Sequence, residues 1–311
     1  MKESTLQKWE KIGHIYQPDG RTPWLHSHAQ LPVADHIDGD LYRVYFAGRT
    51  AEQRSHIGYV ELDITDPKNI LKVAEHPVLV PGPIGFFDEH GVFPASIVTH
   101  EGRKHLYYIG WNQGCKQPLF YANIGLAVSN DGGVTFEKWS KAPVMARSEH
   151  DPCLVTSPHV FIDDDIWRMT YVSGTGWEES DGQLKSFYHI KYAESTDGIQ
   201  WLRDGRIAID YRDAKETNIA RSWVIRGEDG YRMWYSYVYD GTPYRIGYAE
   251  SDDCLTWTRK DYEAGIAPSA TGFDSEMICY PNVVVHDGVL YMFYNGNRFG
   301  QDGFGLARAV E

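Results

Sequence analysis

The stretch LYRVYFAG (41–48) has four later counterparts in the chain, which are HLYYIGWN (105–112), IWRMTYVSG (166–174), YRMWYSY (231–237) and LYMFYNGN (290–297). Every copy is rich in aromatic and β-branched residues, a composition that favours a β-strand. One position can be followed through all copies, as Phe46, Ile109, Tyr171, Tyr235 and Tyr294. These positions are 63, 62, 64 and 59 residues apart. The even spacing indicates an internal repeat.

A second strand-like segment follows each copy, as HIGYVELD (56–63), NIGLAVSN (123–130), HIKYAEST (189–196), RIGYAESD (245–252) and GFGLARAV (303–310). Three of these segments run into a similar turn, as SNDGGVTF (129–136), STDGIQW (195–201) and SDDCLTW (251–257). The first turn resembles the Asp box of β-propellers, and the other two are one residue shorter. We expect the aspartate of each turn to accept hydrogen bonds from backbone N–H groups, which is a structural role.

A third segment precedes the other two, as HAQLPVAD (28–35), GVFPASIV (91–98), TSPHVFI (156–162), IARSWVI (219–225) and CYPNVVV (279–285). Its marker positions are Pro32, Pro94, Pro158, Arg221 and Pro281, spaced by 62, 64, 63 and 60 residues. Repeats of this length with three or four strands each are typical of the blades of a propeller. A propeller of six or seven blades would need shorter repeats, of about 40–45 residues.

The sequence therefore predicts an all-β fold, a five-bladed β-propeller with four-stranded antiparallel blades around a central axis. Residues 1–311 form a single domain in this prediction. The expected blades are roughly 20–80, 81–145, 146–210, 211–265 and 266–311, and the N-terminal segment is a candidate to close the last blade.

Charge and composition argue against several classes of partner. The chain has 30 basic and 43 acidic residues, a net charge of −13, and no run of Lys or Arg longer than two. Neither nucleic acid nor an anionic membrane surface is expected to bind it. No signal peptide or membrane-spanning stretch is visible, so we expect a cytoplasmic protein. The cysteines lie far apart and form no metal-binding pair, at Cys115, Cys153, Cys254 and Cys279.

Residues just before the third-segment markers should meet at one end of the axis. Five positions before the markers stand Ser27, Glu89, Cys153, Glu216 and Glu276. Three further carboxylates lie beside this column, at Asp88, Asp151 and Asp274. Carboxylates gathered on a narrow axis repel one another, which raises some of their pKa values and points to a use in binding or catalysis. A pair of them can serve as acid and base across a glycosidic bond.

Aromatic and histidine residues extend this candidate site. Trp24, Trp111 and Trp177 are expected in loops, where an indole can stack on a sugar face. His26, His28 and His90 fall near the column, where they could bind a metal ion or hydrogen-bond a sugar. No His-x-x-x-His pair is present, and we expect no metal and no cofactor.

The whole chain resembles, in the rhythm of its blades, the five-bladed propeller glycoside hydrolases, including families 32, 43 and 130. His150-Asp151-Pro152 resembles the Arg-Asp-Pro motif of the invertase-like enzymes, in which the aspartate stabilises the transition state. Glu216 stands one blade later, where those families place the general acid. WLHSHAQLPVA (24–34) looks like the opening of blade 1, and FDSEMICYPNVVVHDGVLYMFYNGN (273–297) looks like the closing blade of propeller glycosidase-like proteins.

One departure from those families stands out. They place an aspartate on the first blade as nucleophile or base, whereas this chain reads His28-Ala29-Gln30-Leu31-Pro32, with Asp35 three residues further on. The candidates to replace that aspartate are Glu89, Asp88 and Glu276.

The resemblance implies a glycosidase acting on a carbohydrate substrate. Glu216 would be the general acid, Glu89 or Glu276 the nucleophile or base, and Asp151 the residue that holds charge near the reacting centre. The separation of the carboxylates decides between retention and inversion, and the sequence leaves it open. The expected substrate-binding residues are His28, Gln30, Asp88, His90, Arg221, Asp274, Trp111 and Trp177.

Two other functions stay open. A glycoside phosphorylase would need one carboxylic acid and cationic residues for inorganic phosphate, for which Arg221 and Arg147 are candidates. A sugar-binding propeller without catalysis would use the same aromatic and polar lining. The sequence does not reveal the sugar, the linkage or the oligomeric state.

Overall fold

The computed structural model describes residues 8–180 and 182–310. Within them the chain forms strands β1 to β20 and two short helices, the 3-10 helix η1 (Asp261–Glu263) and α1 (Asn297–Gly300). The all-β prediction is confirmed by this content. No helix in the described ranges is long and apolar enough to cross a membrane.

One sheet contains two successive antiparallel runs of four strands. The first run is β2 (Ser27–Asp38), β3 (Leu41–Arg49), β4 (Ser55–Asp63) and β5 (Ile70–Val73). The second run is β6 (Gly91–His100), β7 (Arg103–Gln113), β8 (Phe120–Ser129) and β9 (Glu137–Lys138). A parallel bridge between Ser55 and Gly91 joins them.

A second sheet repeats this arrangement. Its first run is β10 (Val155–Asp163), β11 (Ile166–Ser180), β12 (Gln183–Ser195) and β13 (Ile207–Ile209). Its second run is β14 (Glu216–Gly227), β15 (Gly230–Tyr239), β16 (Arg245–Ser251) and β17 (Thr258–Arg259). The joining bridge lies between Tyr188 and Asn218.

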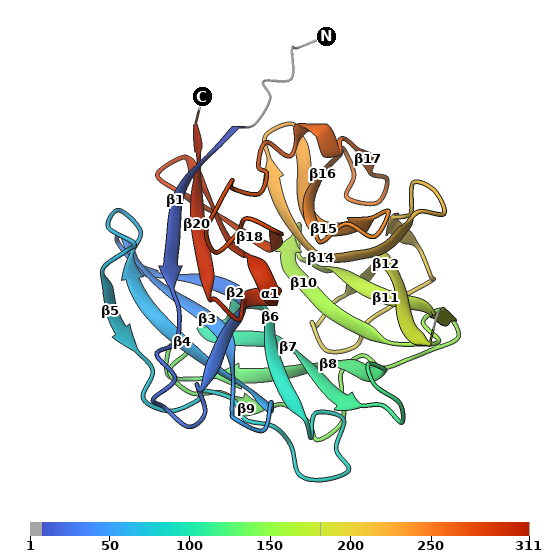
Figure 1. Ribbon diagram of the computed structural model, residues 1–311, viewed down its shortest axis with the longest axis horizontal. Coiled ribbons are helices and arrows are strands. Elements are labelled where there is room, and N and C mark those ends of the chain that lie inside the picture. The colour runs from blue at the N-terminus through green and yellow to red at the C-terminus, as the bar shows by residue number, and fades with distance from the viewer. Residues whose placement is uncertain (1–7, 181, 311) are drawn as a thin grey trace.

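The remaining sheet is built from both ends of the chain. It contains β18 (Cys279–His286), β19 (Val289–Asn295), β20 (Phe304–Val310) and β1 (Lys8–Tyr16), in that order. β1 pairs antiparallel with β20, from Lys8 opposite Val310 to Tyr16 opposite Phe304. The two strands lie side by side in Figure 1.

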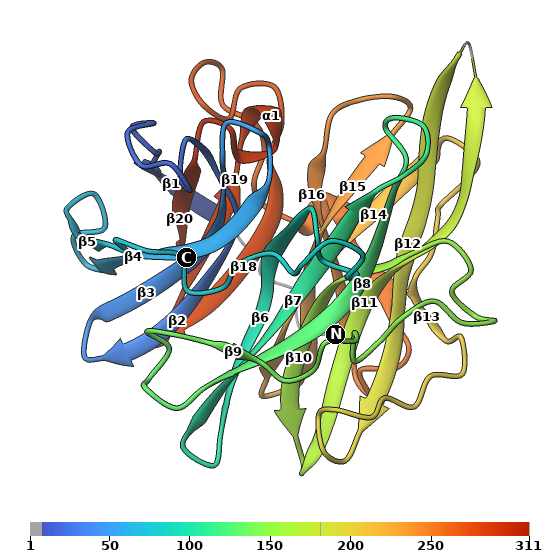
Figure 2. The same cartoon turned by 90° about the horizontal axis from the view of Figure 1, so that it is seen from below.

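The runs are set around a common centre (Figure 1). Their first strands contact one another in the order β2, β6, β10, β14, β18 and back to β2. Figure 2 shows α1, the end of β11 and the start of β12 on the same side of the molecule, at the top of that view. We call this side, on which α1 and these strand ends lie, the upper face.

Each first strand bends near this centre. In four of them a β-bulge leaves two successive residues without a paired residue in the second strand. The first of these two residues has a left-handed backbone conformation. These residues are Leu31, Ser157, Arg221 and Tyr280, with φ of 55°, 48°, 52° and 59°. In β6 the pairing skips one residue, Ala95, and Pro94 stands at the same place as the other four.

The bend corrects the alignment of the third segment. Pro32, Pro158 and Pro281 come one residue after the bend, where β6 has Ala95 and β14 has Ser222. The marker set was therefore wrong by one residue in three repeats. The corrected marker is the residue at the bend itself. Six positions before it, in the second, third and fifth repeats, stand Asp88, Asp151 and Asp274, so the repeat carries a column of aspartates rather than of glutamates.

A similar error affects the first segment. Tyr108 lies opposite Gly125 in the sheet, just as Tyr235 lies opposite Gly247 and Tyr294 opposite Gly305. Tyr108, and not Ile109, is therefore the counterpart of the other tyrosines. Successive strand residues point to opposite faces, so the shift exchanges the two faces of the strand.

The three turns with aspartate have the expected role. The Asp131 carboxylate accepts hydrogen bonds from the backbone N–H groups of Val134 and Thr135, both at 3.0 Å. The same pattern holds Asp197 and Asp253 in their turns. These aspartates fix the connection between the third and fourth strands of their runs.

The aspartate column is structural, because each member is buried against a tyrosine and a cation of its own run. Tyr108 donates to Asp88 at 3.1 Å, and Lys138 lies 2.6 Å from the same oxygen. Tyr294 donates to Asp274 at 2.9 Å, and Lys11 lies 2.6 Å away.

The third run carries the same group with an extra cation. Tyr171 donates to Asp151 at 3.1 Å, while Arg203 lies 2.9 Å and Lys191 lies 3.4 Å from the carboxylate. Lys191 occupies the position at which the other runs have a glycine opposite the tyrosine. We call each such set of Asp, Tyr and Lys or Arg a triad.

The first and fourth runs lack the aspartate of the triad, and each differs at a second position as well. In the fourth run Lys215 stands 20 residues before Tyr235, so Asp261 accepts the hydrogen bond of Tyr235 instead. In the first run His26 stands at that position, and the tyrosine is replaced by Phe46. At this position of the second strand, a tyrosine occurs in the four runs that have a carboxylate to accept its hydrogen bond, and phenylalanine occurs in the run that has none.

We expect Tyr108→Phe to lower the free energy of unfolding by about 1–3 kcal/mol, because a buried carboxylate loses a hydrogen-bond donor. Tyr16→Phe is the control. The Tyr16 hydroxyl makes no hydrogen bond within the described residues, and its removal should change stability by less than about 0.5 kcal/mol. Urea unfolding curves of both variants test this. Equal stability of the two variants would contradict the structural role of the triad.

Candidate functional site

An apolar cluster with members from all five runs surrounds the axis. Its ten buried members are Leu31, Ala95, Ile109, Ala122, Leu154, Val172, Ala220, Tyr244, Met277 and Cys279. Larger, half-buried side chains pack against them, at Phe93, Trp111, Phe120, Trp177, Tyr188, Val238 and Tyr280. We call the two sets together the axial cluster. Apart from the buried Tyr244, its aromatic rings belong to the half-buried set, so they are the part that a ligand can reach.

The aromatic rings of the second run form one connected row, which Arg49 of the first run adjoins. The ring of His90 lies 5.7 Å from that of Trp111, and Trp111 is stacked 6.3 Å from Phe93. The guanidinium of Arg49 lies 5.7 Å from the centre of the Phe93 ring. Arg49 also donates to Gln30 at 2.8 Å.

Tyrosines from the other runs continue the row. The hydroxyl groups of Tyr188 and Tyr244 are hydrogen-bonded to each other, and the rings of Tyr244 and Tyr280 lie 5.9 Å apart. Phe299, in α1, is 6.1 Å from Tyr244. Burial raises the pKa of all three tyrosines above the ordinary value, so their phenols stay neutral and can donate hydrogen bonds.

A hollow of about 330 Å³ lies beside this row. It is lined by Arg54, Ile84, Glu89 and His90. The Glu89 carboxylate accepts a hydrogen bond from the backbone N–H of Gly85 and lies 3.3 Å from the His90 ring. Its side chain is 22% exposed, so a ligand in the hollow can reach it.

Two of the three predicted tryptophans lie in the axial cluster, although not in loops. Trp111 is in β7 and Trp177 is in β11, because both strands extend further than the repeat pattern indicates. Trp177 meets Phe120 edge-on at 5.6 Å. Trp24 is buried against Gly58, where an added Cβ would lie 2.0 Å from the indole, and it lies outside the cluster.

The structure places Asp88, Asp151 and Asp274 in the triads, away from any accessible surface. Each side chain is at most 4% exposed. Burial on its own would raise the pKa of Asp151, but the Ser173 hydroxyl, Lys191 and Arg203 together lower it. The Asp151 carboxylate therefore stays ionised, and both of its oxygens are bound.

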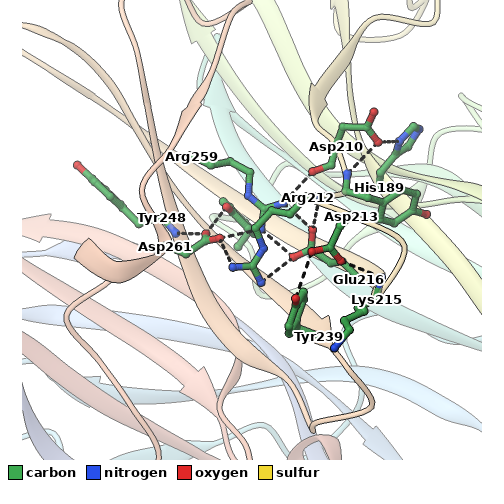
Figure 3. Close-up of polar contacts among 12 residues, drawn as sticks. His189, Asp210, Arg212, Asp213, Lys215, Glu216, Tyr239, Tyr248, Arg259 and Asp261 are labelled. Carbon is green, nitrogen blue, oxygen red and sulfur yellow. Dashed lines mark hydrogen bonds and ion pairs between the residues drawn. The ribbon is translucent and has the colours of Figure 1, made fainter.

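Glu216 is also fully engaged (Figure 3). Its two carboxylate oxygens lie 2.7 and 2.8 Å from the two terminal nitrogens of Arg259, and the backbone N–H of Arg212 donates to it at 2.8 Å. Arg259 also pairs with Asp261 at 2.8 Å. The Glu216 side chain is completely buried, so a proton on it would have no direct path to a glycosidic oxygen.

Arg221 links three runs by hydrogen bonds. It is 1% exposed and donates to the carbonyl oxygens of Pro94 at 3.1 Å and Pro32 at 3.3 Å. Burial lowers its pKa to about 9. Its guanidinium therefore joins β14 to β6 and β2 across the centre.

Of the other predicted residues, Gln30 is buried, while His28 and Glu276 lie closer to the surface. Gln30 links Arg49 to the carbonyl oxygen of Phe299. His28 is half-buried, and its Nδ1 lies 2.8 Å from the Ser27 hydroxyl. Burial, with the nearby cations Arg49 and Arg298, lowers the pKa of His28 to about 4, so the ring is neutral at pH 7. Glu276 is exposed, and its backbone N–H is bound by Asn297.

Sequence reasoning missed several residues of the row. Arg49, Tyr188, Tyr244, Tyr280 and Phe299 were not among the candidates. Tyr280 stands at the bend, so the corrected alignment would have placed it in register with Arg221. The other four come from second and third strands or from loops, where the repeat gives no common marker.

One group of side chains in the described ranges has the spacing of metal ligands. It consists of Asp40, His286 and Asp287, in the turns after β2 and β18. His286 Nε2 lies 2.8 Å from Asp40, and both aspartates are exposed. These turns follow the far ends of the first strands, so the group lies away from the axial cluster.

We expect Glu216→Gln to act on stability. Removing one charge of a buried ion pair should lower the free energy of unfolding by about 3 kcal/mol, because Arg259 loses its partner. Glu276→Gln, at an exposed glutamate, should change it by less than about 0.5 kcal/mol. Chemical unfolding of both variants decides this. A Glu216→Gln protein as stable as the parent would argue against the ion pair as a structural element.

Asp151 should give a pH-dependent contribution. Its pKa is lowered in the folded state, so its stabilising effect is present above the unfolded pKa, about 3.9, and is lost as the pH falls below that value. We expect Asp151→Asn to be less stable than the parent at pH 5–7, with a difference that shrinks below about pH 4. Unfolding at a series of pH values measures this. A difference that is constant down to pH 2.5 would contradict it.

The chain matches no model of a known protein family. It has the fold of glycoside hydrolase-like propeller proteins. A proposed glycosidase of Bacteroides thetaiotaomicron superposes with a TM-score of 0.71 at 19% identity, covering 97% of this chain and 95% of that one. A GH130 protein, from work on hydrolases of β-1,2-mannosidic linkages in Candida mannan, gives 0.75 at 17% identity, covering 99% and 95%.

One relative is much closer in sequence. The uncharacterized protein Rv1502 of Mycobacterium tuberculosis is 40% identical over 299 residues, which cover 96% of this chain and 98% of the relative. Identity at this level along nearly the full length of both proteins means that this chain belongs to the protein family of Rv1502.

Proposed function

We propose that the protein is a glycoside hydrolase that binds its carbohydrate substrate on the upper face, over the axial cluster. The observation that carries the proposal is the row of half-buried aromatic rings with polar edges, from His90 and Trp111 to Tyr188 and Tyr280. Aromatic faces stack on the apolar faces of sugars, and neighbouring polar groups bind the hydroxyls.

The fold underlying this site is, we propose, a closed propeller of five four-stranded blades. The five antiparallel runs would be the blades. Two features support closure. The first strands contact one another in a ring, and β1 from the start of the chain completes the last run by pairing with β20.

Among the predicted catalytic carboxylates, Glu89 and Glu276 fit the chemistry better than Glu216 and Asp151. Glu89 borders the hollow and lies beside His90, and Glu276 is exposed. Glu216 and Asp151 are buried and bound to arginine or lysine. We propose Glu89 as the acid or base nearest to the substrate and Glu276 as its partner.

A carbohydrate-binding propeller without turnover is the second candidate. The burial and neutralisation of Glu216 and Asp151, the two residues with the most specific resemblance to hydrolase motifs, favour it. A phosphorylase is the third. It loses support because Arg221, its main candidate for binding phosphate, is sealed inside the protein on two carbonyl oxygens.

The test is a turnover screen of purified protein on aryl glycosides and oligosaccharides, with and without inorganic phosphate. We expect release without phosphate. Glu89→Gln should lower kcat by at least about 100-fold, as for the loss of a general acid or base. Glu101→Gln is the matched control, since Glu101 is 71% exposed in the turn between β6 and β7.

The other outcomes separate the candidates. Release only with phosphate would indicate a phosphorylase. Sugars that raise the melting temperature without being cleaved would indicate a binding protein. Activity that survives in Glu89→Gln and disappears in a folded Glu216→Gln protein would return the catalytic role to Glu216.

A further inference from the structure

Arg49, at the end of β3, is a half-buried cation beside the axial cluster, with no carboxylate partner among the described residues. Within the described residues its Nε donates to Gln30, and no Asp or Glu oxygen lies within ion-pair distance of it. Burial lowers its pKa, and the neighbouring group that counteracts this is the neutral phenol of Tyr280. A charge removed from water in this way is costly unless a partner of opposite charge is supplied.

Several other buried or half-buried arginines of this chain do have such partners. Arg43 pairs with Glu61 at 2.7 Å, and Arg168 lies 3.2 Å from Asp163. Arg203 and Arg259 pair with carboxylates at 2.9 and 2.7 Å.

Three further arginines, Arg221, Arg232 and Arg245, have no carboxylate within ion-pair distance among the described residues. Arg221 and Arg245 donate to backbone carbonyl oxygens instead. Arg232 lies over the Trp234 ring and stands opposite Glu250 in the sheet. Arg49 differs from these three by its place beside the half-buried Phe93 ring of the axial cluster, in a protein whose net charge is −13.

The surroundings of Arg49 hold its guanidinium in place. The Phe93 ring lies beneath it at 5.7 Å. The side-chain oxygen of Gln30 accepts a hydrogen bond from the Arg49 Nε–H group, and the Gln30 amide nitrogen in turn donates to the carbonyl oxygen of Phe299. The two terminal nitrogens make no hydrogen bond to any described residue. Neither nitrogen is among the fully buried side-chain atoms without a partner in the described residues, so both are open to solvent.

Charges of both signs act beside Arg49. Arg49 and Arg298 both lower the pKa of the neighbouring His28, and Asp302 raises it by less. Asp302 pairs with Arg298, whereas Arg49 has no ion pair within the described residues. Arg49 and Arg221 also both oppose the burial that raises the pKa of Tyr280.

We propose that the glycan bound on the upper face carries a carboxylate, and that this carboxylate is bound by the two terminal nitrogens of Arg49 while its sugar ring stacks on the axial aromatic rings. The inference rests on the proposed carbohydrate function and adds the substrate class, an acidic sugar. A planar carboxylate matches the fork of a guanidinium, which donates two parallel hydrogen bonds. Inorganic phosphate presents a similar oxyanion, and the test separates the two.

The experiment compares matched ligands by titration calorimetry on the full-length protein. Uronic-acid oligosaccharides of the galacto and gluco series are titrated before and after chemical reduction of their carboxyl groups to alcohols. We expect the acidic form to bind roughly 10- to 100-fold more tightly than its reduced form, the range for a hydrogen-bonded charged group. This comparison uses the native protein and does not depend on a variant that folds.

Variants then assign the effect to Arg49. Arg49→Gln should weaken binding of the acidic form by the same roughly 10- to 100-fold and leave the reduced form within about threefold. Arg49→Lys keeps the charge without the fork and should lie between the two. Arg103→Gln, at the start of β7, is the matched control and should bind both forms like the parent.

Each remaining outcome overturns the inference. Equal affinity for the acidic and reduced forms would remove the acidic substrate class and leave the proposed carbohydrate function standing. Binding of neither form would remove both. Binding of inorganic phosphate alone, lost in Arg49→Gln, would replace the acidic sugar by a free phosphate.

Discussion

A buried carboxylate shared between a tyrosine hydroxyl and a cation is the interaction on which the rest of this structure depends. It occurs as Asp88 with Tyr108 and Lys138, and it recurs with Asp151 and Asp274. In each triad the carboxylate precedes the first strand, the tyrosine is in the second strand, and a cation comes from the outer part of the run. The triad therefore connects the inner and outer parts of one run. An unpaired charge at that depth would cost several kcal/mol, so the three members have to be present together. The replacement of tyrosine by Phe46 in the run that lacks the aspartate follows the same rule.

The repeat and its strands could be predicted because they are local. A run of aromatic and β-branched residues specifies a strand wherever it occurs, and five copies at even spacing indicate units around one centre. The turns of Asp131, Asp197 and Asp253 were predictable for the same reason, since their hydrogen bonds stay within four residues. The register at the centre was not, because a bulge adds a residue without leaving a fixed mark in the sequence. Prolines at 32, 158 and 281 looked like the common marker, whereas the bend itself holds residues as different as Leu31, Arg221 and Tyr280.

The roles of the carboxylates could not be predicted because their partners lie elsewhere in the chain. Glu216 and Arg259 are 43 residues apart, and Asp274 and Lys11 are 263 apart. A column of acids read from the sequence looks the same whether it faces a substrate or a lysine. The difference lies in tertiary contacts, which the structure alone provides. The same reasoning explains why Arg49 escaped notice. Its significance is that no carboxylate lies beside it, and the absence of a neighbour leaves no trace in a single sequence.

The pairing of β1 with β20 has a consequence for how the chain is made. Residues 8–16 are synthesised before every other described strand, and their partner strand, Phe304–Val310, is the last of the described strands to be made. Until β20 is made, β1 has no strand to pair with. The earlier runs can fold in order as they emerge, because their contacts are sequential. The pairing of β1 with β20 is thus a late, long-range event, of the kind that slows folding and exposes unpaired strand edges to other chains in the meantime.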